Sequence, residues 1–373
     1  MNALGIIFAN KHDIALEELT DYRTLGAVPF GGRYRLIDFQ LSNMVNAGIL
    51  NIGVITRKNY QSLMRHIGSG SEWDLDRKQG GLTILPPFGG SQNTEDIYSN
   101  RLGALITNLE YIEDSKEKYA IITDCTYVAN LNYEELLKVH KKSGAKMTGI
   151  YTKKAKFVQD GIKNTYVNVN LDGQITDIVV DTEKQDNLGY CLNTWIMEKD
   201  YLIDIIHDAI RHDKSSLRLD IIKPALKKDK IMGYETPSEV LCLNDISSFI
   251  QANLELLKED ARVDLFHSEN GPIITRTRDS APTRYGKNAK ISNSLIADGC
   301  IIDGEVKNSV IFRGVEIGEG TKIENSVVML DVTVGRNVVL NYAIIDDNST
   351  IHDSRGLSGY VTHPFFCGAK TTI

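Results

Sequence analysis

Short apolar runs alternate with longer amphipathic stretches over roughly the first 240 residues of the chain. Ala3–Phe8, Asn51–Thr56 and Tyr119–Thr123 each have the length and composition of a buried strand. Between them, Leu36–Ala47 and Tyr98–Ile112 carry apolar residues at helical spacing. This alternation predicts an α/β domain with a mainly parallel sheet and helices on both faces. Ligands of such a sheet bind beyond the carboxyl ends of its strands.

A repeat with a different period replaces this alternation towards the C-terminus. Residues 308–324 align with residues 325–341, so the period is 17 residues. An aliphatic residue recurs there in steps of six, six and five positions, at Ile311, Ile317, Ile323, Val328, Val334, Leu340, Ile345 and Ile351. One aliphatic residue per face of a three-sided coil predicts a left-handed parallel β-helix, with residues 293–307 as a shorter first coil. A β-sandwich with coincidental alternation is the weaker alternative.

The connection between the two parts also has a distinct pattern. A helix is predicted at about Ile246–Glu259, and the Gly271-Pro272 and Ala281-Pro282 pairs after it mark a linker. We therefore expect three segments: an α/β domain over residues 1–245, a helical bridge and linker over 246–288, and the β-helix over 289–373.

Composition and charge exclude several partners. The 373 residues include 42 Lys and Arg against 49 Asp and Glu, and a net charge of -7 does not suit a nucleic acid. No stretch approaches the roughly 18 uninterrupted apolar residues that a membrane helix needs. The N-terminal apolar run is too short for a signal peptide. Five cysteines stand far apart without a CxxC pair, so we expect reduced thiols and a cytoplasmic location rather than a structural zinc site.

Several long motifs carry a family resemblance. They are AVPFGGRYRLIDF at residues 27–39, LSN at 41–43, NAGI at 46–49, HIGSG at 66–70, WDLDR at 73–77, and in the repeat SLI at 294–296, Gly299-Cys300 and SVI at 309–311. Over nearly its whole length the chain resembles bacterial ADP-glucose pyrophosphorylases (glucose-1-phosphate adenylyltransferases). The resemblance implies a Rossmann-like nucleotidyltransferase domain followed by a left-handed β-helix. It also implies a tetramer that makes ADP-glucose and pyrophosphate from ATP and glucose 1-phosphate, usually under allosteric control.

Positions that serve the chemistry in this family depart from its pattern. The family's phosphate loop, G-G-x-G-[TS]-R-L, falls on residues 10–16, where all three glycines are replaced and Ala15 stands for the arginine. Bulky residues there restrict the backbone that should wrap the phosphates. The family's phosphate-neutralising lysine becomes Leu25, and Arg23 is a weak substitute two positions away. The family's G-T-A-D stretch becomes NTED at residues 93–96.

The metal and sugar-phosphate positions are altered as well. Asp124, in Thr123-Asp124-Cys125, survives as a candidate Mg²⁺ ligand, although an Asp that caps the following turn is an equal alternative. The second metal aspartate maps onto Ser216, and a hydroxyl is a poor ligand for a hard cation. We expect Mg²⁺ only if the chain is catalytically competent. Lys184 is a tentative sugar-phosphate lysine, and a solvated loop lysine is the better interpretation.

Intact scaffold motifs beside altered chemistry are similar to the GlgD-type subunit of this family. That resemblance implies a noncatalytic or weakly catalytic regulatory subunit that forms a heterotetramer with an active subunit; a homo-oligomer of the chain alone is a further expectation. The alternative is an active enzyme that uses Asp124, Arg23 and Lys184. Arg33 and Arg35 flank the intact Gly-Gly turn and are tentative sites for a sugar-phosphate or nucleotide effector. A hexapeptide acyltransferase is disfavoured, because His352 and His363 lie outside the middle of the repeat.

Overall fold

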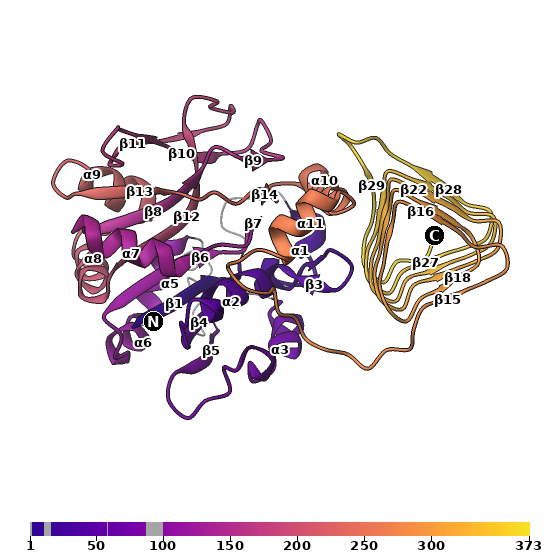
Figure 1. Cartoon of the computed structure of the whole chain (residues 1–373), viewed down its shortest axis with the longest axis horizontal. Helices are drawn as coiled ribbons and strands as arrows, with labels where there is room; N and C mark the ends of the chain where they lie inside the picture. Colours follow the sequence, from indigo (N-terminus) through magenta and orange to yellow (C-terminus); the bar gives the residue numbers. More distant parts are fainter. Residues whose placement is uncertain (1, 11–15, 58, 87–99) are drawn as a thin grey trace.

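The computed structural model describes residues 2–10, 16–57, 59–86 and 100–373. An α/β domain and a triangular parallel β-helix lie side by side, and the helices α10 and α11 lie between them (Figure 1). No helix among the described residues is long and apolar enough to cross a bilayer.

The central sheet of the α/β domain is mixed. Its described strands run in the order β11-β10-β12-β6-β1-β4-β5, with β8 and β13 attached beside β12. Neighbouring strands β6, β1, β4 and β5 are parallel, whereas β12 pairs antiparallel with both β6 and β8. The bounds are β1 Ala3–Phe8, β4 Asn51–Ile55, β5 Gly81–Leu85, β6 Tyr119–Asp124, β8 Met147–Thr152, β10 Asn164–Val169, β11 Ile175–Asp181, β12 Gly189–Glu198 and β13 Ile231–Glu235.

Both faces of this sheet are covered. In β1, Leu4, Ile6 and Phe8 belong to one apolar cluster and Ala3 and Ile7 to the other, as the two-residue period of a strand requires. Helices α2 and α7 pack in the second cluster, and α5, α6 and α8 in the first. The bounds are α1 Glu17–Thr20, α2 Leu36–Asn46, α3 Gln61–Ile67, α5 Arg101–Thr107, α6 Leu109–Asp114, α7 Tyr133–Ser143, α8 Lys199–Arg211, α9 Lys223–Ala225, α10 Ile246–Glu255 and α11 Glu259–Phe266.

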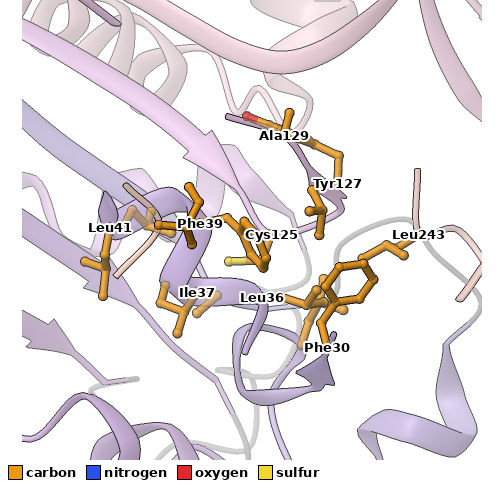
Figure 2. Packing of buried hydrophobic residues seen from close by; sticks show 14 of the residues in the cluster. Phe30, Leu36, Ile37, Phe39, Leu41, Cys125, Tyr127, Ala129 and Leu243 are labelled. Atoms are coloured by element: carbon orange, nitrogen blue, oxygen red, sulfur yellow. The ribbon is translucent and has the colours of Figure 1, made fainter. Parts of the chain in front are cut away.

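Short elements connect these layers. They are the 3-10 turns η1 Leu25–Ala27 and η2 Ser71–Trp73, the π-helical turn η3 Leu217–Ile222, and the strands β2 Pro29–Phe30, β3 Tyr34–Arg35, β7 Tyr127–Val128, β9 Ala155–Lys156 and β14 Val240–Cys242. Figure 2 shows Phe30, Leu36 and Phe39 packed close to Cys125, which joins the β2–α2 segment to the end of β6. All five cysteines are buried and free.

Two helices predicted as continuous are each broken. The stretch 98–112 contains α5 and α6, separated at Asn108, which leaves helical geometry and donates its side-chain amide to the Ala104 carbonyl at 2.8 Å. Within the stretch 246–259, α10 ends at Glu255. Lys258 is extended and caps the start of α11 at Glu259. Apolar periodicity continues across both breaks, so it could not reveal them.

The repeat forms a parallel β-helix, as predicted. Its three described sheets are β15-β18-β21-β24-β27, β16-β19-β22-β25-β28 and β17-β20-β23-β26-β29. Val310 pairs with Val327 and Val327 with Ile344, so the coil advances by 17 residues, whereas Leu295 pairs with Val310 across a shorter coil. The first strand, β15, starts at Arg284, shortly before residue 289.

The bounds of the β-helix strands follow the three faces. They are β15 Arg284–Tyr285, β18 Ile301–Ile302, β21 Glu316–Ile317, β24 Thr333–Val334 and β27 Thr350–Ile351; β16 Lys290–Ser292, β19 Glu305–Lys307, β22 Lys322–Glu324, β25 Val339–Asn341 and β28 Gly356–Ser358; and β17 Leu295–Ile296, β20 Val310–Ile311, β23 Val327–Val328, β26 Ala343–Ile345 and β29 Phe365–Cys367.

The β-helix packs directly on the α/β domain. Val310, Val327 and Ile344 of the third face belong to the same apolar cluster as Ile250 of α10. The turn between β2 and β3 places Gly31 and Gly32 at φ +60° and +85°, a conformation that glycine adopts without strain. A Cβ atom at Gly32 would lie 3.8 Å from Ala297 and from the Ile311 carbonyl, so the intact Gly-Gly turn faces the β-helix.

Candidate functional site

A cleft of about 340 Å³ lies at the carboxyl ends of β1 and β4, where this kind of sheet binds its ligands. We call it the sheet-edge cleft, and it is lined by Asn10, Thr20, Asp21, Arg23, Thr24, Leu25, Arg57 and Asn59. Asn10 is the first residue of the altered phosphate loop. Ala15 and the 93–96 stretch, both of which we predicted to be degenerate, lie outside the described residues.

Leu25 and Arg23, in the loop after α1, contribute to the charge of the sheet-edge cleft, which Asp21 and Arg57 also line. Leu25 begins η1 and is fully buried, so an apolar side chain stands where the family has its lysine. Arg23 is turned towards the β-helix, and its Nη2 lies 2.6 Å from both carboxylate oxygens of Asp346. Its Nη1 lies 3.3 Å from Oδ2 of Asp347. Burial of Arg23 lowers its pKa, but the two carboxylates outweigh burial and raise it. Arg23 is thus a charge shared between the two domains.

Asp124 is the last residue of β6, beside the carboxyl end of β1, where a metal ligand is expected. The side chain is fully buried, and one carboxylate oxygen is paired with the Arg101 guanidinium. The other accepts hydrogen bonds from the backbone N–H of Thr126, at 3.1 Å, and from its hydroxyl. Asp124 therefore both caps the following turn and neutralises a buried arginine.

Ser216, the position of the second metal aspartate, is a helix cap. Its Oγ accepts a hydrogen bond from the Leu219 N–H at 3.1 Å at the start of η3. The backbone N–H of Ser216 donates to the Asp220 carboxylate at 2.8 Å, and this bond is the main cause of a lowered Asp220 pKa. Among the described residues, neither Ser216 nor Asp220 has a hydrogen bond to Asp124.

The described residues therefore do not fit Mg²⁺. No three His, Cys, Asp or Glu side chains gather to hold a metal in the part of the chain that the structure describes. The surviving carboxylate, Asp124, already has a cationic partner in Arg101, and a divalent ion would compete with that guanidinium. The sequence did not suggest Arg101 as this partner, because nothing in a sequence marks which distant residue will face a strand end.

Lys184 lies in the β11–β12 connection. Its side chain is 53% exposed and pairs with Asp186 at 3.0 Å, and its backbone N–H donates to Asp160 at 2.9 Å. Lys184 is absent from the lining of the sheet-edge cleft. The solvated loop lysine is therefore the interpretation that the structure favours.

The intact motifs hold the scaffold together. Asp38 caps the start of α2 through the Arg35 N–H, at 2.9 Å, and also binds His66 Nε2 at 2.6 Å. Asn43 bonds the Ala129 carbonyl at 3.0 Å and the Leu131 N–H at 3.1 Å, which ties α2 to the segment after β7. These roles give the motifs a structural function that does not depend on catalysis.

A second cavity, of about 300 Å³, lies between the α/β domain and the β-helix. We call it the arginine crevice, and it is lined by Arg35, Ser62, Arg65, His66, Arg276, Arg278, Leu330, Asp331, Asp347 and Asn348. Arg35 donates to the Ser62 hydroxyl at 2.7 Å, and burial lowers its pKa to about 10. Arg33 is exposed, with its guanidinium 5.6 Å from the Tyr34 ring centre, and lines an adjoining small cavity with Arg35 and Arg313.

The sequence suggested Arg33 and Arg35 but missed Arg276 and Arg278. Both lie in the segment that we interpreted as a linker, and the Arg-Thr-Arg pattern at residues 276–278 was the available signal. Asp347 brings a carboxylate into this basic surface. Burial raises the pKa of Asp347 to about 6, while the charges of Arg23 and Arg35 oppose that rise.

A sheet with its cleft at the carboxyl ends of parallel strands, followed by a hexapeptide-type β-helix, defines the class of nucleotidyltransferases with a C-terminal β-helix. Residues 15–192 match the nucleotidyl transferase family model, and residues 280–357 match that of the GlmU-like C-terminal hexapeptide domain. The chain is 33% identical over 322 residues to the glycogen biosynthesis protein GlgD of Bacillus subtilis, covering 86% of this chain and 82% of that protein.

Catalytic relatives are equally similar. The glucose-1-phosphate adenylyltransferase of Fervidobacterium nodosum is 34% identical over 361 residues, covering 94% of this chain and 84% of that enzyme. The enzyme of the same name from Clostridium botulinum (strain Alaska E43) is 34% identical over 332 residues, covering 87% and 84%. The chain belongs to the glucose-1-phosphate adenylyltransferase family, as its motifs predicted.

Proposed function

We propose that this chain is a noncatalytic or weakly catalytic regulatory subunit of a glucose-1-phosphate adenylyltransferase in bacterial glycogen biosynthesis. It acts in the cytoplasm by stimulating an active subunit of the same family, with which it forms a heterotetramer. The similarity to a protein named for glycogen biosynthesis supports the pathway. The similarity to an adenylyltransferase over most of both chains supports the partner, because a shared fold offers matching surfaces.

One observation carries the loss of catalysis: the pairing of Asp124 with Arg101. In this family the reaction joins two polyanions, so the site must supply cations at the transferring phosphate. Arg101 is buried and paired with Asp124, Leu25 carries no charge, and Arg23 is paired with the β-helix. Arg57 is a further cation that lines the cleft, but it does not stand at the position of the family's lysine. Removing one such cation from a transition state commonly costs about 3 kcal/mol, a factor of 100 or more in rate.

We further propose that the arginine crevice binds an anionic effector, a sugar phosphate or a nucleotide. Arg35, Arg276 and Arg278 line one cavity that both domains enclose. Guanidinium groups bind phosphate in a fixed bidentate geometry, so a cluster of them suits this ligand class.

The test is pyrophosphate release from ATP and glucose 1-phosphate with Mg²⁺, measured for this chain alone, for a catalytic subunit from the same genome alone, and for their mixture. We expect no turnover by this chain alone. We expect a higher or effector-shifted rate in the mixture than in the catalytic subunit. Co-elution of the two chains at the mass of a tetramer is the matching physical measurement.

A catalytic subunit that lacks its own metal carboxylates is the matched control. It should abolish all turnover in the mixture, because this chain contributes none. Robust Mg²⁺-dependent turnover by the isolated chain would instead support the alternative, an active enzyme that uses Asp124 and rearranged cations.

A further inference from the structure

Two neighbouring carboxylates of the β-helix, Asp346 and Asp347, link the sheet-edge cleft to the arginine crevice. Arg23 lines the sheet-edge cleft, Asp347 lines the arginine crevice, and Asp346 stands next to Asp347 at the corner after β26. Arg23 binds both carboxylates, at 2.6 Å to Asp346 and 3.3 Å to Asp347. One ion-pair cluster therefore reaches both cavities.

The β-helix fixes this pair of carboxylates from behind. The Asp347 N–H donates to the Asp346 carboxylate at 2.7 Å, and the Asp346 N–H donates to the Cys367 carbonyl at 2.9 Å. The Leu330 N–H donates to the Asp347 carboxylate at 3.2 Å. These bonds hold the two carboxylates to the backbone of the coil. When a charge near them changes, we therefore expect the strength of their interactions with the arginines to change, while the β-helix stays in place.

The two carboxylates differ in what they face. Asp346 is fully buried, lies within 2.6 Å of Arg23 Nη2 through both carboxylate oxygens, and does not line the arginine crevice. Asp347 is nearer the surface, with 17% of its side chain exposed; it pairs with Arg23 at 3.3 Å and lines the arginine crevice together with Arg35. Asp347 is thus shared between a cleft arginine and a crevice arginine.

We infer that Asp347 couples the two cavities, so that an anion bound in the arginine crevice and a phosphate ligand bound in the sheet-edge cleft weaken each other. An anion in the crevice occupies Arg35 and repels the Asp347 carboxylate, which then interacts more strongly with Arg23. Arg23 is held more firmly to the β-helix and is less available to a ligand in the cleft. This inference rests on the anion-binding part of the proposed function.

The reverse effect has the same size by linkage. A phosphate ligand in the sheet-edge cleft attracts Arg23 and leaves Asp347 to Arg35, which partly neutralises the arginine crevice. The coupling between two ligand sites is reciprocal, and such couplings commonly change an affinity about fivefold or more. The β-helix thereby takes part in setting the charge of a cleft that it does not line.

Hydrogen exchange of the isolated full-length chain, followed by mass spectrometry with and without inorganic phosphate, tests the coupling. The informative segments are Thr20–Val28 at the cleft and Ser62–His66 at the crevice. Asp347→Asn removes the shared charge. Asp331→Asn is the matched control, because Asp331 also lines the crevice and stands at a left-handed φ of 55° that asparagine tolerates. Among the described residues, the ion-pair partners of Arg23 are Asp346 and Asp347, not Asp331.

In the wild type and in Asp331→Asn, phosphate should protect Ser62–His66 and slow exchange over Thr20–Val28 about fivefold. In Asp347→Asn, phosphate should still protect Ser62–His66, at lower phosphate concentration, while Thr20–Val28 no longer responds. A response of Thr20–Val28 that persists in Asp347→Asn, or that is missing in a wild type whose crevice is occupied, would overturn the coupling.

A failure of the anion site gives a different result. If phosphate protects neither segment, the effector part of the proposed function is wrong. The link between Arg23 and the β-helix is then tested without ligand, by comparing Asp346→Asn with Asp331→Asn. Faster exchange over Thr20–Val28 in Asp346→Asn alone supports the link, and equal exchange contradicts it. Thermal unfolding of each variant confirms that it is folded.

Discussion

At the scale of single residues, charged side chains at or near the positions that the family uses for chemistry pair with other side chains of this chain. Where its family uses a carboxylate to hold a metal, Asp124 holds Arg101. Arg23, near the position of the family's lysine, holds Asp346. Each pair is almost fully buried, and a buried pair depends on both partners, because either one alone would leave an uncompensated charge in the interior. In both pairs, a charge at a position that the family uses for chemistry is already neutralised within the protein.

The Asp124–Arg101 pair can be tested by removing its cation. Arg101→Leu should lower the free energy of unfolding of the α/β domain by about 3–5 kcal/mol, because it leaves the Asp124 charge buried and unpaired. Urea unfolding followed by tryptophan fluorescence measures it, since the chain's two tryptophans, Trp73 and Trp195, are both buried in that domain.

The control for this variant is the double substitution Arg101→Leu with Asp124→Asn. An asparagine can still accept the bond from the Thr126 N–H, so the double variant should be more stable than Arg101→Leu alone. Equal stability of the single and double variants would show that the Asp124 carboxylate costs no stability once Arg101 is removed, which contradicts a buried, unpaired charge.

At the scale of elements, the β-helix corners use asparagine for two reasons. Asn293, Asn308 and Asn325 have left-handed φ angles of 41°, 48° and 50°, which asparagine tolerates better than other residues with a Cβ. Their side-chain amides also form a ladder of hydrogen bonds along the coils. Each donates to the asparagine of the next coil, at 2.8, 3.4 and 3.1 Å, and the ladder ends at Asn341. The backbone and the side chain therefore favour the same residue.

Substitutions at Asn325 separate these two contributions. Asn325→Ala should destabilise the β-helix by roughly 2 kcal/mol, because alanine bears the left-handed strain of about 1–2 kcal/mol and loses the ladder bonds. Asn325→Gly loses only the ladder bonds and should be intermediate in stability. Differential scanning calorimetry gives the order, and an alanine variant as stable as the glycine variant would exclude backbone strain as the cause.

The sequence predicted the β-helix well because each coil places one aliphatic residue per face, so the period alone fixes which strands pair. It predicted the strands β1, β4 and β6 for a similar reason, since fully buried strands are short continuous apolar runs. It could not predict the break at Asn108, because the apolar pattern continues across it. The partners of Asp124 and Arg23 were not predictable either, because they come from elements far apart in the chain.

At the scale of the whole molecule, the domain interface is both a packing surface and an electrostatic one. Val310 and Val327 pack with α10, while at its edges Arg23 pairs with Asp346 and the arginine crevice opens between the domains. An anion in that crevice contacts both domains at once. Binding there stabilises the relative position of the domains by mass action, without any change in the fold.

The charge state of Asp347 makes this crevice sensitive to pH. Burial raises the pKa of Asp347 to about 6, with Asp346 adding to the rise and Arg23 and Arg35 opposing it. Since the folded-state pKa lies above the value of an unfolded aspartate, the stability that this group contributes is full below about pH 4 and is lost as the pH rises through 6. As the pH falls through 6, Asp347 becomes protonated, so the crevice becomes more positive.

Sulfate affinity should therefore rise as the pH falls from 7.5 to 5.5, and calorimetric titration measures it with an anion whose own charge stays constant over that range. His66, Arg65, Arg276, Arg278 and Asp331 also face the crevice, and protonation of His66 would act in the same direction. Asp347→Asn isolates the contribution of Asp347. The sulfate affinity of this variant at pH 7.5 should match or exceed that of the wild type at pH 5.5. Its sulfate affinity should also change less with pH than that of the wild type. Equal pH dependence in the two proteins would assign the effect to His66 instead.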